Sequence, residues 1–283
     1  MQPMKQASIS HRNDGIIKNP VTTVTPHRLG VFRPVKQMQG ELEDILVENS
    51  WGKCKLPSCV LTQVHACIIE SIFISSLKIN VAQDGAVAIL IVIPSVLRNM
   101  GKTTRNHTWF HSKIVELQNQ VIEIETKTMK ISSRVIRKVF EYKNFINEDG
   151  KVWAIVFESE FSRFLLSDQG IFYPPHLLKV IAALPGSAQA IVRFCWSHAG
   201  GVRGEMIQSI LRGHLKYAWS NVRDENKCIK KILAVATEIQ KTGITIDLAG
   251  RVWFERKYGV GYLKPENFAM NCRNTISGPG LIT

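Results

Sequence analysis

The chain has 283 residues, of which 45% are apolar, and this length suffices for two ordinary globular domains with a large buried core. Its 36 Lys and Arg residues outnumber its 23 Asp and Glu residues, and the formal net charge of +13 favours a polyanion as partner. Since no apolar run reaches the length of a membrane span and Met1–Gln6 lacks the apolar core of a signal peptide, we expect a cytoplasmic protein without a membrane partner.

The first forty residues mix Pro, Thr, Asn and basic residues without sustained periodicity. They carry six Lys or Arg residues against one Asp, a composition that is typical of irregular, solvated chain. We therefore expect a flexible basic arm over residues 1–40, followed by a first folded domain over residues 41–166.

The first domain alternates apolar runs at helical and at strand spacing. Thr62 is a typical N-cap, and the apolar residues after it cover more than one face, so a buried central helix is expected over Thr62–Leu77. The continuous apolar run Val87–Ile93 indicates a strand buried on both faces. The other elements are expected in this order: helices Ser95–Met100 and His107–Gln118, strands Val121–Glu125, Val135–Tyr142 and Val152–Phe157, and helix Glu158–Leu166.

The second domain, residues 167–260, begins with three expected helices. They are Leu177–Leu184, Ala188–Ala199 with Ser187 as N-cap and Gly200-Gly201 as end, and Glu205–Arg212 with Gly213 as end. Each has its apolar residues at helical spacing.

A longer helix is expected over Asp224–Thr242, because its apolar residues share one face and its lysines lie opposite. Asn221 or Asp224 can cap its start, and Gly243 supplies the left-handed residue that ends helices. The alternating segments Ile244–Leu248 and Val252–Phe254 then predict a hairpin with one buried face.

Two helices followed by a hairpin, sharing one small core, is the element order of a winged-helix DNA-binding domain. The first half of the chain shows a similar order: helix, strand, two short helices and strands. The predicted fold class is therefore α+β, with two tandem winged-helix domains over residues 41–166 and 167–260, a flexible basic N-terminal arm, and an irregular tail over residues 261–283.

The basic helix of the second domain is the candidate for contact with double-stranded DNA. An α-helix fits the major groove, and side chains near its start reach base edges. The candidates for base readout are Tyr217, Trp219, Asn221, Arg223, Asn226, Lys227 and Lys230. The alternative interpretation is that these lysines form only the solvated face of a surface helix.

The chain resembles plasmid replication initiators of the two-winged-helix Rep type, and in particular TrfA-like initiators. The resemblance spans residues 41–255 and rests on the following segments: Trp51-Gly52, Leu61–His65, Gly85–Ile93, Trp153–Leu165, Tyr173, Leu184–Ser197, Tyr217 and Lys230–Asp247. It implies a DNA-binding replication initiator that binds repeated sites at a plasmid origin, promotes origin opening and recruits the host replicative helicase, with the host initiator as a further partner.

This resemblance also implies roles for the two domains. The second would read an origin repeat in the major groove, and the first would contribute backbone contacts and a homodimer interface. Phosphate contacts would come from Lys102, Arg105 and Lys113 in the first domain and from Arg212, Lys216, Lys231, Arg251, Arg256 and Lys257 in the second. The protein would then be associated with the nucleoid or the plasmid.

No enzyme motif is complete in the sequence, so we expect no catalytic residues, no cofactor and no enzymatic activity. The cluster Cys54, Cys59, His65 and Cys67 lacks the spacing of a zinc site, and no metal is expected. Two alternative functions stay open: a winged-helix transcriptional repressor, which would use the same DNA contacts, and a DNA strand-processing enzyme such as a recombinase.

Overall fold

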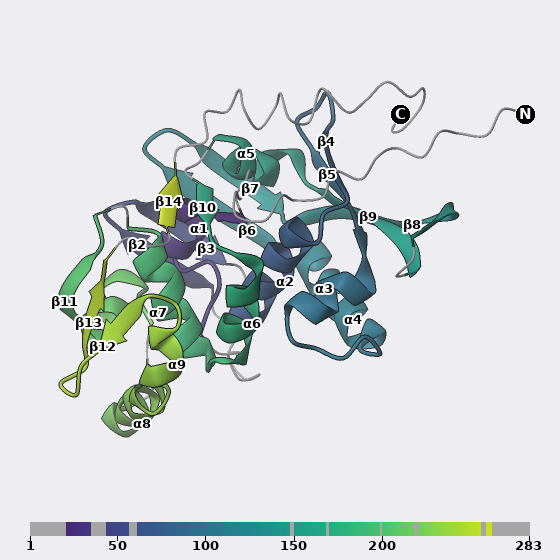
Figure 1. The fold of residues 1–283 in the computed structure, drawn as a ribbon. Helices are drawn as coiled ribbons and strands as arrows, with labels where there is room; N and C mark the ends of the chain where they lie inside the picture. Colours follow the sequence, from purple (N-terminus) through teal and green to yellow (C-terminus); the bar gives the residue numbers. More distant parts are fainter. Residues whose placement is uncertain are drawn as a thin grey trace, which may run out of the picture.

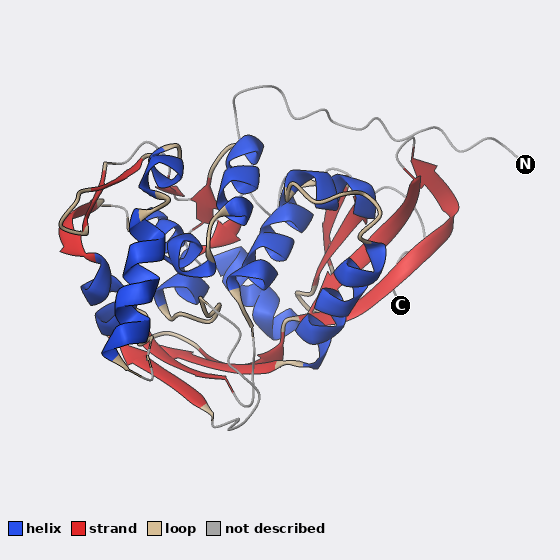
Figure 2. Ribbon diagram, turned by 90° about the horizontal axis from the view of Figure 1, so that it is seen from below, coloured by secondary structure: helices blue, strands red, loops and turns tan. Residues whose placement is uncertain are grey.

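The computed structural model describes residues 21–34, 44–56, 61–147, 150–167, 170–198, 200–217, 219, 221–255 and 259–261 (Figure 1). Within these ranges the fold is α+β, and every strand pair is antiparallel. Figure 2 shows most helices gathered in the middle of the molecule, with strands mostly at its periphery.

The first half contains two four-stranded sheets, ordered β2-β3-β6-β7 and β4-β5-β9-β8. Its strands are β2 (Ile45–Asn49), β3 (Gly52–Leu56), β4 (Lys78–Val81), β5 (Val87–Val92), β6 (Val121–Thr126), β7 (Lys130–Arg134), β8 (Ile136–Asn147) and β9 (Gly150–Phe157). Its helices are α2 (Gln63–Ile74), α3 (Ile93–Asn99), α4 (His107–Asn119) and α5 (Ser159–Ser167).

The second half is smaller and carries the three-stranded sheet ordered β11-β13-β12. Its elements are α6 (Pro175–Ala183), α7 (Gly186–Trp196), β11 (Val202–Met206), the π-helical turn η1 (Ser209–His214), α8 (Val222–Leu233), α9 (Ala236–Gln240), β12 (Ile244–Ile246) and β13 (Arg251–Phe254). In Figure 1 this sheet and α8 lie at one side of the molecule, and α3, α4 and the β4-β5-β9-β8 sheet lie at the other.

The two halves repeat one topology. The series α2, β5, α3, α4, β8, β9 and the series α7, β11, η1, α8, β12, β13 both run helix, strand, helix, helix, strand, strand. In each sheet the last of these strands lies between the other two, as β5-β9-β8 and as β11-β13-β12. The shared order leaves out β4, which precedes β5, and β6 and β7, which lie between α4 and β8. In the second half it leaves out α9, which lies between α8 and β12.

The helix α2 confirms the predicted start after Thr62 and the predicted burial. The Thr62 side chain accepts a hydrogen bond from the backbone of His65, and the His65 ring accepts one from the Thr62 N–H at 2.9 Å. This reciprocal capping box fixes the first turn. The helix ends at Ile74, short of the predicted Leu77, and 11 of its 12 residues are buried.

The prediction of a flexible arm over residues 1–40 is wrong for residues 21–34. Here β1 (Thr22–Thr23) pairs with β10 (Gly170–Phe172), which in turn pairs with β14 (Gly259–Gly261), and α1 (Val24–Arg28) follows. Apart from Thr25 and Arg28, every residue of this stretch is buried. We call Val21–Pro34 the N-terminal strap. Residues 1–20, 35–40 and 262–283 lie outside the described residues, whereas Gly261, predicted to be irregular, is in a strand.

Three helix predictions in the second half need correction. The expected helix Asp224–Thr242 breaks at Val235, where φ is −114°. Helix α9 packs beside β12 and α6, so contacts with residues distant in sequence set the course of the chain after Val235. Gly243, at φ 82°, is the predicted left-handed end.

The other two corrections also reflect tertiary contacts. Glu205 and Met206 lie in β11 rather than in a helix, because β13 pairs with them, and η1 continues through Gly213. Helix α7 begins at Gly186 and ends at Trp196, so Ser187 lies inside its first turn. A Cβ atom on Gly186 would lie 1.8 Å from the Pro34 carbonyl oxygen, so close packing of the strap requires glycine at this start.

One continuous apolar core joins the halves that the sequence predicts as separate domains, and it runs from Val21 to Phe254. A buried ion pair lies at this junction: Arg193 of α7 donates to Glu70 of α2 at 2.7 and 2.6 Å. Arg193 also donates to Gln63 at 2.8 Å. Burial alone would lower the pKa of Arg193, but the Glu70 carboxylate outweighs this effect, so the pKa lies above its ordinary value.

The capping histidine makes stability depend on pH. Its Nδ1 accepts from Thr62, so its Nε2 carries the proton and donates to Glu116 at 2.9 Å. Burial lowers the pKa of His65 to about 4, below the unfolded value near 6.5. The neutral ring therefore stabilises the fold fully above about pH 6.5, and this contribution is lost as the pH falls toward 4.

We expect His65→Gln to flatten this pH dependence, because a glutamine at this helix position can still accept from the Thr62 N–H but does not titrate. Between pH 7 and pH 4, the free energy of unfolding should fall by roughly 2–4 kcal/mol less in the variant than in the unaltered protein. Urea unfolding at several pH values measures the difference. Equal pH dependence in both proteins would remove His65 as the titrating group.

Candidate nucleic-acid interface

Helix α8 exposes one basic stripe to solvent. The exposed side chains Arg223, Asn226, Lys227, Lys230 and Lys231 recur at helical spacing, while the opposite face packs on the core. Across the described part of the chain, Lys227, Lys230 and Lys231 have no carboxylate partner within ion-pair distance. The charges of these lysines are therefore free to interact with an anionic ligand.

The corresponding helix of the first half, α4, has no such stripe. Its exposed residues are His107, Thr108, Ser112, Val115 and Asn119, none of which is a Lys or an Arg. Its lysine, Lys113, is one-fifth exposed and pairs with Glu116 at 2.5 Å. The same position in the repeated topology is thus nearly neutral in one half and strongly basic in the other.

The start of α8 is capped as predicted. The Asn221 side-chain oxygen accepts from the Asp224 N–H at 2.9 Å, which satisfies one free amide of the first turn. The Asn221 amide nitrogen also donates to the Asp224 carboxylate at 2.9 Å. Asn221 is therefore occupied as a helix cap, although the sequence places it among the base-reading candidates.

A buried carboxylate joins α8 to η1. Glu225, in the first turn of α8, is 2% exposed and accepts from Gln208 at 2.7 Å and from Arg212 at 2.5 Å. Arg212, predicted to contact phosphate, thus serves as the partner of a buried charge, and about half of its side chain stays exposed. Such pairs are costly to break because the remaining charge would stay buried.

The two aromatic candidates for base readout pack against arginines. The Tyr217 and Trp219 rings meet edge to face with centroids 4.7 Å apart. Arg33 of the strap lies 5.5 Å from the Tyr217 centroid, and Arg212 lies 5.5 Å from that of Trp219. Burial raises the pKa of Tyr217. Both side chains are half-buried.

The β12–β13 hairpin lies in the same small sheet as β11 and presents an exposed outer face. Arg203 and Trp253 are direct partners across β11 and β13, and Arg251 is exposed near the turn. The Asp247 side chain fixes this turn by accepting from the Arg251 N–H at 2.8 Å, and Leu248 at its tip is fully exposed. Arg203 and Trp253 were not predicted as DNA-contact residues from the sequence, although their alternation with buried residues marks them as outward-facing.

The remaining phosphate candidates are scattered. Lys102 lies 5.3 Å from the Trp109 ring and Arg105 is exposed, both in the first half. Lys216 is exposed and adopts a left-handed φ of 48°. Arg256 and Lys257 lie outside the described residues. The structure therefore brings together the candidates on α8 and does not bring those of the first half into the same cluster.

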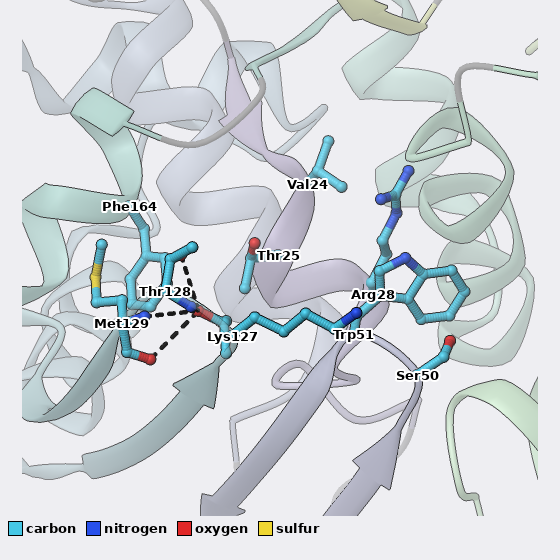
Figure 3. A pocket seen from close by; sticks show the side chains of 10 residues that line it. Val24, Thr25, Arg28, Ser50, Trp51, Lys127, Thr128, Met129 and Phe164 are labelled. Carbon is cyan, nitrogen blue, oxygen red and sulfur yellow. Dashed lines mark hydrogen bonds between the residues drawn. The ribbon is translucent and has the colours of Figure 1, made fainter.

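A pocket of about 610 Å³ lies beside the strap and was not predicted from the sequence. Figure 3 shows the Lys127 side chain extending toward Trp51, with Arg28 beside the Trp51 ring, and none of the described residues that line this pocket carries a carboxylate. This chemistry suits a small anion. However, Arg28 donates to the Ser197 carbonyl and lies 5.2 Å over the Trp51 ring, so its guanidinium is largely engaged.

A second pocket, of about 410 Å³, is lined by three titratable side chains, those of His65, Glu116 and Lys113. Both ring nitrogens of His65 are used, one by the Thr62 N–H and one by Glu116, so the ring has no nitrogen left to act as a base.

Within the described ranges, no three His, Cys, Asp or Glu side chains are grouped as metal ligands. No helix there is long and apolar enough to cross a membrane.

Comparison with known proteins finds no protein-family model, no curated protein and no solved structure that matches this chain.

Proposed function

We propose that this protein binds double-stranded DNA sequence-specifically through two tandem winged-helix units, with α8 as the recognition helix. The observation that carries the proposal is the basic stripe of α8, whose lysines have no carboxylate partner among the described residues and which lies on the same side of the molecule as the β12–β13 hairpin (Figure 1). The repeated order helix, strand, helix, helix, hairpin supports the winged-helix interpretation of both halves. The contrast between α8 and α4 favours the second unit as the one that reads DNA.

The stripe contains the side-chain types that read base edges in the major groove. Arg223 can bind guanine through two hydrogen bonds, and Asn226 can bind adenine in the same way. Lys227, Lys230 and Lys231 continue along the helix, where they would meet phosphates and release counterions. Arg251 on the hairpin would add a flanking phosphate contact.

The biological role that we propose is replication initiation at repeated sites of a plasmid origin, with recruitment of the host helicase. The support is the resemblance to two-winged-helix initiators together with the repeated topology. A transcriptional repressor would use the same α8 contacts and is the second candidate. Deleting the gene should cause loss of a plasmid that carries the adjacent origin if the protein is an initiator, and should only change transcription if it is a repressor.

Footprinting on the DNA that neighbours the gene tests the shared DNA-binding step. We expect protection at regularly spaced sites, because an initiator binds repeats. Random DNA of equal length is the control. Uniform protection of both DNAs, or protection of neither, would contradict specific recognition.

Asn226→Ala is expected to relax discrimination at a single base pair of the site. The loss of one bidentate contact should cost about 1–3 kcal/mol on the preferred sequence and almost nothing on a duplex with that pair exchanged. Binding to a panel of single-pair variants of the footprinted site measures the effect. Gln240→Ala, which removes an exposed side-chain amide from α9, is the matched control. Equal weakening on every duplex would show that Asn226 reads no base.

A further inference from the structure

We propose that Arg33 of the N-terminal strap is a positioning residue for α8, acting through a continuous chain of contacts that ends at Glu225. This inference rests on the proposed function, because it explains how the recognition helix keeps its orientation. Arg33 itself does not touch DNA in this proposal.

Arg33 is held at both ends. Its backbone N–H donates to the Leu61 carbonyl at 2.7 Å, and its own carbonyl accepts from Gln63 at 3.0 Å, so its main chain belongs to the start of α2. Its guanidinium, in a residue that is only 7% exposed, donates to the Leu215 carbonyl at 2.8 Å and to the Lys216 carbonyl at 3.1 Å. One residue thus connects the first half to the loop between η1 and α8.

That loop has a backbone conformation that needs support. Lys216, at φ 48°, is the one non-glycine residue with positive φ among the described residues, and the left-handed region is unfavourable for a residue with a Cβ atom. Arg33 binds the carbonyls of Lys216 and of the residue before it. The strap also approaches closely here, because a Cβ atom on Gly30 would lie 3.2 Å from the Leu215 oxygen.

From this loop the contacts continue to the recognition helix. Arg33 stacks on Tyr217, and Tyr217 meets Trp219 edge to face. The Arg212 guanidinium lies over the Trp219 ring, and Arg212 donates a hydrogen bond to the buried Glu225 in the first turn of α8. Both arginines are therefore committed to protein contacts, and together with the two rings they fix where α8 begins.

This arrangement should matter more for base readout than for phosphate contact. Base-edge hydrogen bonds need side chains placed to within about 0.5 Å, whereas long lysine side chains can adapt to a shifted helix. Loss of Arg33 should therefore reduce specific affinity and leave the number of phosphate contacts unchanged.

The test compares Arg33→Met with Arg137→Met. Arg137 is the matched control, because it also loses several hydrogen bonds but lies in the first half, where it pairs with Glu158 at 2.9 Å and Asp84 at 2.6 Å. For Arg33→Met we expect about tenfold weaker binding to the footprinted duplex, unchanged binding to random duplex and an unchanged salt slope. Arg137→Met should match the unaltered protein in all three.

Two outcomes would overturn the proposal in this assay. Specific affinity equal to that of Arg137→Met would show that Arg33 positions nothing. A salt slope reduced by about one, with equal loss on random duplex, would make Arg33 a direct phosphate contact. If the methionine variant does not fold, Arg33→Lys, which keeps the charge and one donor, is tested in the same way. An intermediate loss of specific affinity is then expected.

Amide hydrogen exchange without DNA separates this proposal from the proposed function. In Arg33→Met or Arg33→Lys, residues 215–217 and 221–226 should exchange faster than in Arg137→Met, since they lose the contacts that depend on Arg33. Unchanged exchange there would overturn the positioning role, even if the protein binds DNA. If exchange is faster in the Arg33 variants but the unaltered protein prefers no duplex, the positioning role of Arg33 is retained and the DNA-binding proposal is refuted.

Discussion

Replacing Arg193 with methionine is expected to lower the free energy of unfolding by about 3–5 kcal/mol. Arg193 is fully buried in α7 and donates to both carboxylate oxygens of Glu70 in α2. Methionine occupies much of the same space but cannot donate, so the Glu70 carboxylate would stay buried without its charge partner. Urea unfolding at neutral pH measures the change.

The double variant Glu70→Leu with Arg193→Met distinguishes a lost charge partner from lost packing. Because well-packed apolar residues often replace a buried ion pair at little cost, the double variant should recover most of the stability. Arg137→Met, which breaks a partly exposed pair, should cost only about 1 kcal/mol. A double variant as unstable as Arg193→Met would show that the loss comes from packing and not from the unpaired carboxylate.

The elements that sequence reasoning predicted well are those defined by neighbouring residues. The start of α2 at Thr62, the cap of α8 at Asn221 and the left-handed Gly243 each depend on groups within a few positions along the chain. The β12–β13 hairpin likewise follows from local alternation of buried and exposed residues. Such signals are visible in a single sequence.

The strap could not be predicted, because what orders it is distant in sequence. Local composition describes residues 21–34 as basic and irregular, but Arg33 is bonded to Leu215, which lies 182 positions away, and Arg28 is bonded to Ser197. Pairing between β1 and β10 adds a further long-range contact. Propensity carries no information about partners at such separations.

The candidate site was predicted in part for the same reason. The spacing of Arg223, Lys227 and Lys230 predicts a shared exposed face, which the structure has. The pairing of Arg212 with a buried Glu225 depends on how η1 lies relative to α8, which is set by tertiary packing. A basic residue beside α8, such as Arg212, can therefore hold this helix in place through a buried carboxylate.

Removing two lysines from the α8 stripe, as Lys227→Ala with Lys230→Ala, is expected to weaken DNA binding by about a hundredfold at physiological salt. For each lysine that no longer contacts a phosphate, DNA binding releases one counterion fewer. The slope of log affinity against log salt concentration should therefore fall by about two in the double variant. Fluorescence anisotropy with the footprinted duplex at several salt concentrations measures both quantities. Stability should change little, because both side chains are exposed.

The matched control removes the same charge elsewhere, as Lys138→Ala with Lys179→Ala. Both of these lysines are exposed, and they lie on β8 and α6, so neither belongs to α8 or its hairpin. If binding depends on where the cations sit, this control should keep nearly all of the affinity and the full salt slope. If both double variants lose affinity equally, attraction by the net charge of the chain explains the binding, and α8 is then only a solvated surface helix.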